Sequence, residues 1–459
     1  MEVFMNLVYG VQDKPKFGQV IVFALQQLLA ILAATIAVPS IIGNGMSQSA
    51  ALFGAGIGTL VYLLFTKFKS PVFLGSSFAF LGSMGAAFAG AVSVSAGYTG
   101  LIIGAVGAGL VYVVIAVVVK FCGVKWINKI MPAVVIGPTV AIIGLSLAGN
   151  AIGDLSTGKV MHEVVVEGVG TGVYEQDASV YACIIVGLVT LFVTMICSVY
   201  GKKFLKMIPF IIGIASGYAV AAIMTVIGNA ADIAALRIID FSAFANMTWV
   251  PDFTFIEAIK GFKDVNLEYV ITVLVAYVPV AFVVFAEHIA DHKNLSSIIE
   301  TELLEDPGLH RTLLGDGVGS MAGAFFGGCP NTTYGESVGC VAISGNASIV
   351  TILATAIMAI VAAFIAPFTT LLATIPNCVM GGVCIALYGF IAVSGLKMIQ
   401  PVDLGDNRNL FVVSVILIAG IGGMTLNFGN VTVTEVACAL ILGIIANVIL
   451  KDRKNEKAE

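Results

Sequence analysis

Apolar stretches of about 20 residues recur along the whole chain, and they restrict the fold more than any other feature of the sequence. A helix needs roughly that length to cross the hydrocarbon core of a bilayer. The 459 residues are 59% hydrophobic and only 11% charged, with a mean hydropathy of +1.04. This balance differs strongly from that of soluble domains. The sequence therefore predicts an all-α polytopic membrane protein in which no soluble domain is left over.

Breaks at charges, prolines and glycine clusters divide the apolar stretches into two series of seven predicted spans. The first series lies near 18–42, 49–66, 71–90, 97–120, 131–150, 179–199 and 207–228. The second series lies near 266–290, 311–328, 330–345, 347–371, 375–395, 409–426 and 431–450. We therefore expect fourteen transmembrane spans in all.

The positions of Lys and Arg give an independent test of this count, because the loops on the cytoplasmic side of a membrane protein are the basic ones. All but four of the 22 basic residues fall on one side: Lys14, Lys16, Lys67, Lys69, Lys120, Lys125, Lys129, Lys202, Lys203, Lys206, Lys293, Arg311, Lys397, Arg408, Lys451, Arg453, Lys454 and Lys457. Lys159, Arg237, Lys260 and Lys263 fall on the other side. Both termini are therefore expected in the cytoplasm, with the protein in the cell membrane.

Seven spans that start inside end outside, so the second series has the inverted orientation and the two halves can form an inverted repeat. Transporters built in this way bind their substrate near the midplane, between discontinuous helices at matching positions of the two halves. Span 3 and span 10 each open on a proline, Pro71 and Pro330, and continue through Gly, Ser, Thr and aromatic residues. We expect short extended segments followed by half-helices there, with backbone amides that face a ligand.

Ionisable residues inside predicted spans are the strongest functional signal, since each costs several kcal/mol near the bilayer centre unless it is paired or hydrated. Span 10 carries Glu336, and span 8 ends in Glu287, His288, Asp291 and His292. Glu287 and Asp291 are four residues apart and share a helical face. For Asp291 and His292, a solvated cytoplasmic helix end is an equally good interpretation. Asp316 and Glu435 also lie near membrane depth, where an interfacial position fits them as well.

Several classes of protein are excluded by the remaining composition. The eight cysteines show no C-x-x-C spacing, which argues against a disulfide framework and a zinc site, so neither a metal nor another cofactor is expected. The net charge is −5, and no basic cluster resembles a footprint for nucleic acid. The N-terminal residues lack the pattern of a removable signal peptide, and the first span is expected to direct insertion.

Two carboxylates from the two halves, together with backbone donors, suit a small neutral ring that bears both N–H donors and carbonyl acceptors. One of the carboxyl groups can take up and release a proton with the substrate, which outlines a coupling mechanism. Tyr334 and Phe78 offer faces on which a planar ring can stack. Ordinary core packing explains these two aromatic residues equally well.

Five motifs spread along the chain resemble one known family. They are "LGSSFAF" (74–80), "AEHI" (286–289), "DPGLHR" (306–311), "PNTTYGE" (330–336) and "MGGV" with "LYG" (380–389). Together they are similar to the nucleobase-ascorbate transporters, the second type of nucleobase:cation symporters, and in particular to the members that carry uracil. The resemblance covers nearly the whole chain. It implies fourteen spans in a seven-plus-seven inverted repeat.

The same resemblance implies two moving units and a homodimer. The core domain comprises spans 1–4 and 8–11 (1–128 and 266–372), and the gate domain comprises spans 5–7 and 12–14 (129–265 and 373–459). The family's uracil-binding glutamates correspond to Glu287 and Glu336, and its backbone donors correspond to Phe78 and Gly335. Further lining residues correspond to Ala34 in "LAATIAVP", Tyr334, and Tyr388 in "ALYGF". Proton coupling corresponds to Glu287, Asp291 and His288.

Two departures from the family pattern concern the coupling site. Asp291 stands where the family has a histidine four residues after the first glutamate, and His292 follows it. Gln27 replaces a histidine of the first span. An aspartate ionises to an anion, so Asp291 can relay protons or favour Na⁺. We expect H⁺ to be the coupling ion, with Na⁺ as the alternative.

The leading hypothesis is import of uracil by proton symport. A purine or xanthine permease of the same family is the nearest rival, and Tyr334 argues against it because a bulky side chain leaves less room for a two-ring base. An anion exchanger or channel of similar architecture is a rival from another class, but two buried glutamates suit an anion site poorly. An integral-membrane enzyme is the third alternative. The sequence shows no metal-ligand cluster, no nucleophile with its base and no phosphate loop that would support it.

Overall fold

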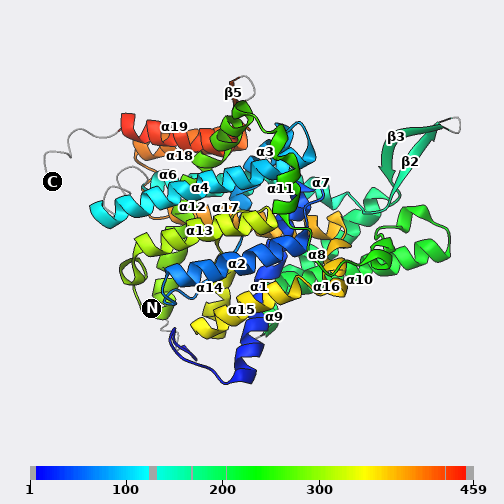
Figure 1. Ribbon diagram of the computed structural model, residues 1–459, viewed down its shortest axis with the longest axis horizontal. Coiled ribbons are helices and arrows are strands. Elements are labelled where there is room, and N and C mark those ends of the chain that lie inside the picture. The colour runs from blue at the N-terminus through cyan, green and yellow to red at the C-terminus, as the bar shows by residue number, and fades with distance from the viewer. Residues whose placement is uncertain (1–6, 124–131, 167–168, 203, 429–430, 451–459) are drawn as a thin grey trace.

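A computed structural model describes residues 7–123, 132–166, 169–202, 204–428 and 431–450. Within these ranges the chain is mostly helical (Figure 1). The first half contains the helices α1 (Phe17–Ile42), α2 (Gln48–Phe65), α3 (Leu81–Ala89), α4 (Val94–Cys122), α6 (Ala133–Ser146), α7 (Ala148–Leu155), α8 (Val180–Tyr200), α9 (Phe204–Met207) and α10 (Pro209–Ala230). The second half contains α11 (Thr254–Gly261), α12 (Leu267–Ile299), α13 (Leu309–Gly327), α14 (Gly335–Ser344), α15 (Ile349–Ala362), α16 (Ala366–Ala373), α17 (Asn377–Ile399), α18 (Asn407–Ile421) and α19 (Glu435–Ile449).

Among the described residues, eight helices are long and apolar enough to cross a membrane: α1, α2, α4, α6 with α7, α8, α10, α12 and α17. The pair α15 and α16 is bent by 82° and makes a ninth if it counts as one span. Helices also occupy the other predicted spans, but they are shorter, as in α18 and α19, or less apolar, as in α13. The prediction of a polytopic helical membrane fold is thus confirmed in this coarser form.

The basic residues used for the orientation are only partly within the described ranges. Lys125, Lys129, Lys203 and the tail residues Lys451, Arg453, Lys454 and Lys457 lie outside them.

Polar residues fix where several helices begin. The side chains of Ser47, Ser93 and Asn266 accept hydrogen bonds from backbone N–H groups in the first turns of α2, α4 and α12. Such caps satisfy donors that have no acceptor within the helix. Each of these three helices therefore starts at a residue whose side chain accepts a hydrogen bond from the first turn.

Small residues let the central helices pack closely. Helix α13 packs on α2 and α4, and α6 packs on α17. At the contact of α13 with α2, a Cβ atom added to Gly58 would come within 2.8 Å of the Gly319 carbonyl oxygen. Glycine at such places allows two backbones to approach, which is how helices associate in a membrane. This packing explains why α13 is central although it is only weakly apolar.

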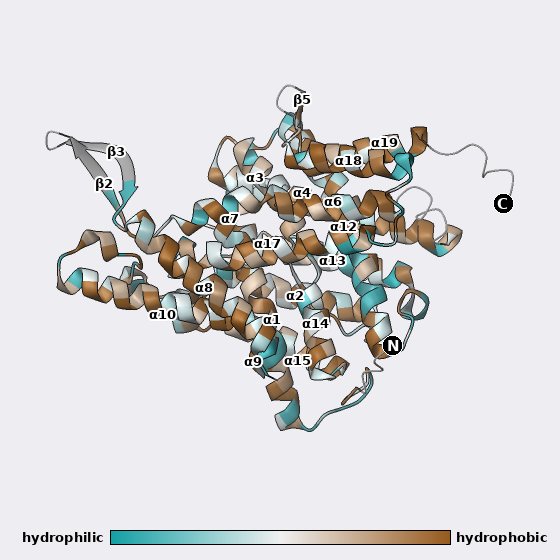
Figure 2. Ribbon diagram, turned by 180° about the vertical axis from the view of Figure 1, so that it is seen from behind, coloured by the Kyte–Doolittle hydropathy of each residue, from teal (hydrophilic) through white to brown (hydrophobic). Residues whose placement is uncertain are grey.

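The outer helices have the opposite character. In α8 and α10 only a third of the most apolar window is buried within the protein. Phe192, Ile196 and Val226 are exposed large hydrophobic side chains on these helices. Figure 2 shows that hydrophobic residues cover most of the helices, whereas many of the hydrophilic ones lie near helix ends and in connections. These surfaces suit contact with lipid.

Within the described ranges, three two-stranded antiparallel sheets interrupt the helices. They pair β1 (Leu74–Ser76) with β4 (Asn331–Thr333), β2 (Met161–Val166) with β3 (Val169–Gln176), and β5 (Leu426–Phe428) with β6 (Val431–Val433). The β2–β3 hairpin projects from the body of the molecule (Figure 1). The first sheet agrees with the extended segments predicted after Pro71 and Pro330. The two hairpins were not predicted.

Two predicted boundaries need correction. The predicted span 8 ended at 290, but α12 continues to Ile299 and ends where Glu300 takes a left-handed conformation with φ of 52°. The predicted span 11 at 347–371 is divided into α15 and α16. The first correction matters for function, because it places Asp291 and His292 inside a helix rather than at its end.

Candidate functional site

Helix α12 supplies four ionisable side chains of the site, and its geometry sends them in two directions. Residues four apart lie on the same face of an α-helix, and adjacent residues are turned by about 100°. Glu287 and Asp291 share one face and are partly exposed, whereas His288 and His292 share another and are fully buried. The side chains of one short stretch are thereby divided between a cavity and the protein interior.

The β1–β4 pair leads into helices whose first N–H groups can serve as backbone donors. Its register joins Leu74 to Thr333 and Ser76 to Asn331, so the two strands run in opposite directions. Each strand leads into a helix, with η1 (Phe78–Phe80) and α3 after β1, and α14 after β4. The first N–H groups of a helix have no intrahelical acceptor and carry its positive dipole end. The amides of Gly335 and Glu336 are such groups.

A cavity of about 290 Å³ lies where α12 meets the start of α14. It is lined by Glu287, Asp291, Gly335 and Glu336 on one side. The apolar residues Phe210, Leu387, Phe390 and Ile391 from α10 and α17 line it as well. Its volume is near the lower limit of ligand pockets, about 300–1,000 Å³. An apolar cavity with a few converging polar groups is the usual form of a small-molecule site.

Lys206 of α9 also lines this cavity, together with Met398 and Ile343. It is the cationic side chain among the described lining residues, and it is exposed. Lys206 comes from one of the basic loops in the sequence. Sequence analysis used it only to assign orientation and did not place it at the site.

Three polar contacts hold the segment 331–344, called the binding segment below, in place. Thr333 of β4 donates a hydrogen bond from its hydroxyl to Asp291 Oδ2 over 2.8 Å. The amide of Gln27 on α1 donates to both the hydroxyl and the carbonyl oxygen of Ser337, which follows Glu336 directly. The Phe73 N–H group donates to the same hydroxyl over 3.0 Å. The start of α14 is therefore tied to α1, to α12 and to the segment before β1.

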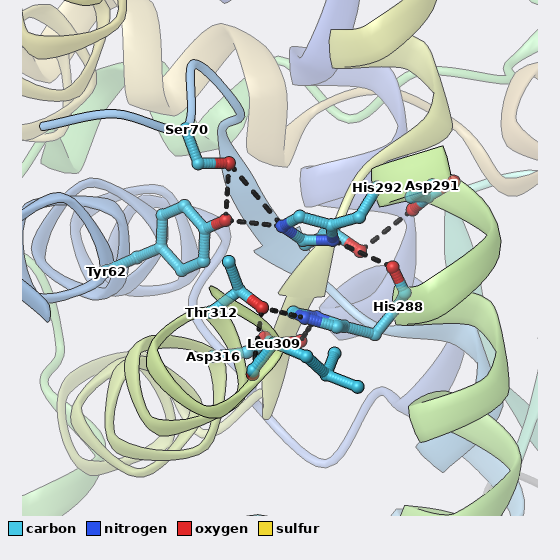
Figure 3. Close-up of polar contacts among 9 residues, drawn as sticks. Tyr62, Ser70, His288, Asp291, His292, Leu309, Thr312 and Asp316 are labelled. Atoms are coloured by element: carbon cyan, nitrogen blue, oxygen red, sulfur yellow. Dashed lines mark hydrogen bonds and ion pairs between the residues drawn. The ribbon is translucent and has the colours of Figure 1, made fainter. Parts of the chain in front are cut away.

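The two buried histidines do not line the cavity, and they form a cluster with polar side chains of α2 and α13 (Figure 3). His288 Nδ1 lies 2.7 Å from Asp316 Oδ2, and its Nε2 lies 3.0 Å from the Thr312 hydroxyl. His292 Nδ1 donates to the His288 carbonyl oxygen over 2.8 Å, and its Nε2 lies 2.6 Å from the Tyr62 hydroxyl. The two rings are tilted by 31° to each other, with centroids 4.0 Å apart.

Four residues named from the family resemblance lie near the cavity without lining it. Ala34, Phe78, Tyr334 and Tyr388 are all buried, with at most 8% of their surface exposed. The Tyr334 hydroxyl donates to the Ser76 carbonyl oxygen over 2.7 Å, so this ring closes over the β1–β4 pair. Phe78 and Tyr388 meet edge to face, with ring centroids 5.7 Å apart. Their assignment to the substrate site stays a prediction.

Sequence reasoning missed several members of these clusters. Thr312, Thr333 and Ser337 are small hydroxyl residues whose types carry no signal of their own. Asp316 was noted near membrane depth but was not assigned to the site, although it lies in "LLGDGVGS" among glycines of a buried helix. A helical wheel that continued α12 to residue 299 would have grouped His292 with His288.

The arrangement can bind a small ligand that offers both donors and acceptors. The carboxylates of Glu287 and Glu336 accept hydrogen bonds, and the first amides of α14 donate them. In the part of the chain that the structure describes, no group of three or more His, Cys, Asp or Glu side chains is arranged to hold a metal ion.

Comparison with known proteins identifies the class. Residues 18–429 match the model of a family described as "Permease family". The uracil permease of Bacillus caldolyticus is 38% identical over 97% of this chain and 95% of its own length. Those of Bacillus subtilis (strain 168) and Escherichia coli (strain K12) are 37% and 34% identical, and the alignments cover at least 94% of every chain.

Solved structures agree at the level of the fold. The transmembrane domain of the cyanobacterial bicarbonate transporter BicA is 16% identical, with a TM-score of 0.63 over 96% of this chain and 99% of that domain. SLC26A9 gives a TM-score of 0.61 over 95% of this chain and 66% of its own, at 12% identity.

The chain therefore belongs to this permease family. It is a multi-pass membrane transport protein and not an enzyme, and the family resemblance found in its motifs is confirmed.

Proposed function

We propose that this transporter imports uracil across the cell membrane by cation symport, with H⁺ as the coupling ion. The observation that carries the proposal is the cavity in which Glu287 and Glu336 meet the first amides of α14. Uracil is a small planar ring with N–H donors and carbonyl acceptors, and this site offers the complementary groups. The relatives named uracil permease, at 34–38% identity over almost the whole chain, support the same substrate.

In the proposed complex, Glu287 and Glu336 accept hydrogen bonds from the ring N–H groups. The Gly335 amide donates to one carbonyl oxygen, and the Phe78 amide donates to another when the site is assembled. Ala34, Tyr334 and Tyr388 surround the ring. Phe78 and Tyr388 already contact each other near the cavity, which supports a substrate site where their two elements meet.

The proposed architecture is a fourteen-span inverted repeat with a core domain (1–128 and 266–372) and a gate domain (129–265 and 373–459). Helix packing supports this division: α13 packs on α2 and α4, and α15 packs on α1 and α2. In the other unit, α17 packs on α6 and α8, and α10 packs on α8. The cavity has walls from both groups, so relative motion of the domains can expose it to either side.

We infer that both termini are cytoplasmic and that the cavity opens toward that side. Lys206, at the cavity lining, belongs to one of the predicted cytoplasmic loops. Cysteine substitutions in the loops, labelled from outside intact cells, test this orientation. We further propose a homodimer, on the basis of the family resemblance, and light scattering of the purified protein in detergent tests it.

For coupling, we propose that Glu287 and Asp291 take up the transported proton, because their side chains line the cavity. Asp291 also accepts the hydrogen bond of Thr333 on the binding segment. Protonation of Asp291 therefore changes the strength of this bond to β4. His288, predicted with them, does not line the cavity. Na⁺ is the alternative ion, and imposed gradients of H⁺ and Na⁺ distinguish the two.

The substrate is tested by uptake of labelled uracil into cells that lack their own uracil transporter. Saturable uptake that excess unlabelled uracil abolishes, and excess xanthine or hypoxanthine does not, is the expected result. If purines compete better than uracil, the protein is a purine permease of the same family.

The ion is tested with purified protein in liposomes. An imposed inward pH gradient should drive accumulation of uracil, whereas an imposed Na⁺ gradient at equal pH should not. Accumulation with the Na⁺ gradient alone would refute proton coupling and leave the substrate assignment untouched.

A further inference from the structure

The buried face of α12 carries a histidine pair that the substrate cavity does not use. His288 and His292 are 0% and 1% exposed, and neither lines the cavity. Burying polar groups is costly unless each of them is hydrogen-bonded. Both ring nitrogens of each histidine have a partner. The hydrogen-bonding pattern can therefore be used to count the protons.

The count for His288 starts at Thr312. A backbone carbonyl oxygen can only accept, and the Thr312 hydroxyl donates its one proton to the Leu309 carbonyl oxygen over 3.1 Å. The hydroxyl oxygen must then accept from His288, so Nε2 carries a proton. At the other ring nitrogen, His288 and Asp316 face each other over 2.7 Å and share one further proton. Either an imidazolium faces a carboxylate, or a neutral ring faces a carboxylic acid.

Loss of that shared proton would leave an uncompensated charge. Asp316 is 1% exposed, and its second oxygen, Oδ1, has no hydrogen-bond partner. Among the described residues, its only ion-pair partner is His288. A buried carboxylate with a single neutral partner and one unpaired oxygen is far less stable than a paired group. The pair is neutral, and fully matched at Nδ1, only while it holds the proton.

His292 extends the connection to a third helix. Its Nδ1 donates to the His288 carbonyl oxygen, its Nε2 contacts the Tyr62 hydroxyl over 2.6 Å, and the Tyr62 and Ser70 hydroxyl oxygens lie 2.7 Å apart. Through His288 and His292, α12 is thus bound to α13 and α2 over a full turn. Glu287 lies on the same turn and faces the cavity. The contacts of His288 and His292 therefore fix the rotation of α12 about its own axis, and with it the direction in which Glu287 points.

We propose that His288 and Asp316 hold one proton between them throughout the transport cycle and act as a positioning pair for Glu287. The transported proton is then carried by the cavity carboxylates alone. This inference rests on the proposed function, because its readouts are binding and uptake of uracil. It assigns to His288 a role in which the proton stays in place.

The titratable groups around the pair come from three helices. They are Tyr62 on α2, Tyr112 on α4, and Glu287, Asp291 and His292 on α12 itself. Any of them can contribute to protons exchanged when uracil binds. The experiment therefore compares variants at one position instead of relying on one pH profile.

The test combines three substitutions with two measurements. The measurements are the KM of uracil uptake and the number of protons exchanged per uracil bound, followed with a pH dye in weakly buffered detergent solution. Asp316→Asn supplies a fixed N–H donor to His288 Nδ1 and mimics the proton-holding pair. Its KM should stay within about twofold of the original, and its proton number should be unchanged. Asp316→Leu leaves Nδ1 unpaired and should raise KM at least about tenfold.

Ser320→Ala, one turn further along α13 and also buried, is the matched control and should leave both readouts unchanged. A loss of one proton per uracil in Asp316→Asn, or uracil exchange without accumulation, would show that the pair releases its proton and would overturn the proposal. An unchanged KM in Asp316→Leu would overturn the positioning role.

If Asp316→Asn does not fold, the double variant His288→Leu with Asp316→Leu replaces it. Removal of both partners of a buried pair is often tolerated, so this variant should keep the proton number and raise KM. A lower proton number in that variant overturns the proposal. Absence of uracil binding by the unsubstituted protein would instead refute the proposed function.

Discussion

The segments 74–89 and 331–344 are built alike, yet they differ in what they present to the cavity. Each consists of a three-residue strand followed by a short helix, and the strands pair with each other. Every residue from Leu74 to Phe80 is buried, whereas Gly335 is exposed and Glu336 is partly exposed at the cavity. The second segment, the binding segment, therefore lines the cavity, whereas no residue of the first, the supporting segment, does so in this structure. A repeated backbone thus provides one surface that is open to the cavity and one that is covered, whose Phe78 amide reaches the substrate only in the proposed complex.

The largest effect is expected from Glu336→Gln, because it removes the charge by which the binding segment differs from its counterpart. A hydrogen bond to a charged group contributes about 1.5–3 kcal/mol, so the affinity for uracil should fall roughly 10- to 100-fold. Glu287→Gln should act similarly from α12. Uptake of labelled uracil and the amount of protein in the membrane are the measurements.

Glu435→Gln is the matched control for this change. Glu435 also lies in the first turn of a helix that follows a strand, α19 after β6, and it does not line the cavity. Its substitution should leave uptake unchanged. Normal uptake by both Glu336→Gln and Glu287→Gln would refute the proposed site.

A smaller but still clear loss is expected from Gly75→Ala in the supporting segment. An added Cβ atom would collide with the ring of Tyr334, which is buried and bound to Ser76. Overpacking of this kind costs about 1–3 kcal/mol. Thermal unfolding in detergent should occur at lower temperature, and uptake should fall several-fold. Gly85→Ala in α3, where nothing lies within 4 Å of the new atom, should match the original protein.

A moderate effect is expected from Gln27→Leu, which removes the contact of α1 with the start of α14. Ser337 loses the Gln27 donor but keeps the Phe73 N–H group as a partner. Gln27 makes two hydrogen bonds to Ser337, one of them long at 3.3 Å, and their joint loss costs about 1 kcal/mol, so KM should rise about fivefold. Gln26→Leu, at the neighbouring position, serves as control. Equal KM values for the two variants would show that α1 does not hold the binding segment.

The smallest effect is expected from Gly335→Ala in the binding segment. The nearest atom to an added Cβ would be Asp291 Oδ1 at 4.0 Å, and the backbone N–H donor is retained. The KM for uracil should therefore change by less than about threefold. A loss as large as that of Gly75→Ala would remove the distinction between the supporting and the binding segment.

Hydropathy and the charges of the loops were sufficient to predict a polytopic helical membrane fold, because a bilayer allows few alternatives. The extended segments were predicted from Pro71 and Pro330 and from the Gly, Ser, Thr and aromatic residues that follow them. Hydropathy and loop charges did less well elsewhere. They were insufficient for α12, since Lys293 and Asn294 resemble a solvated helix end. That helix continues to Ile299 and buries His292. The hydrogen bonds of His288 to α13 and of His292 to α2 outweigh the local polarity of the sequence.

The cavity carboxylates could be predicted because charge at membrane depth is rare and costly. Glu287, Asp291 and Glu336 were recognised in this way, and all three line one cavity. Residues that contribute a single hydrogen bond could not be predicted. Thr312, Thr333 and Ser337 are of types that are equally common at positions where they only pack. Lys206 was hidden because its loop appeared to be only a topology signal.

The β1–β4 pairing also constrains how the protein is made. Ser76 of β1 is hydrogen-bonded to Tyr334, the residue directly after β4, although the two are 258 residues apart in the chain. During synthesis the first strand must wait for the second, and until then its backbone groups lack their partners inside a membrane or an insertion channel. Contacts between such distant segments form late. The binding segment is therefore completed only after most of the chain has been inserted, and a truncated chain would lack the site as a whole.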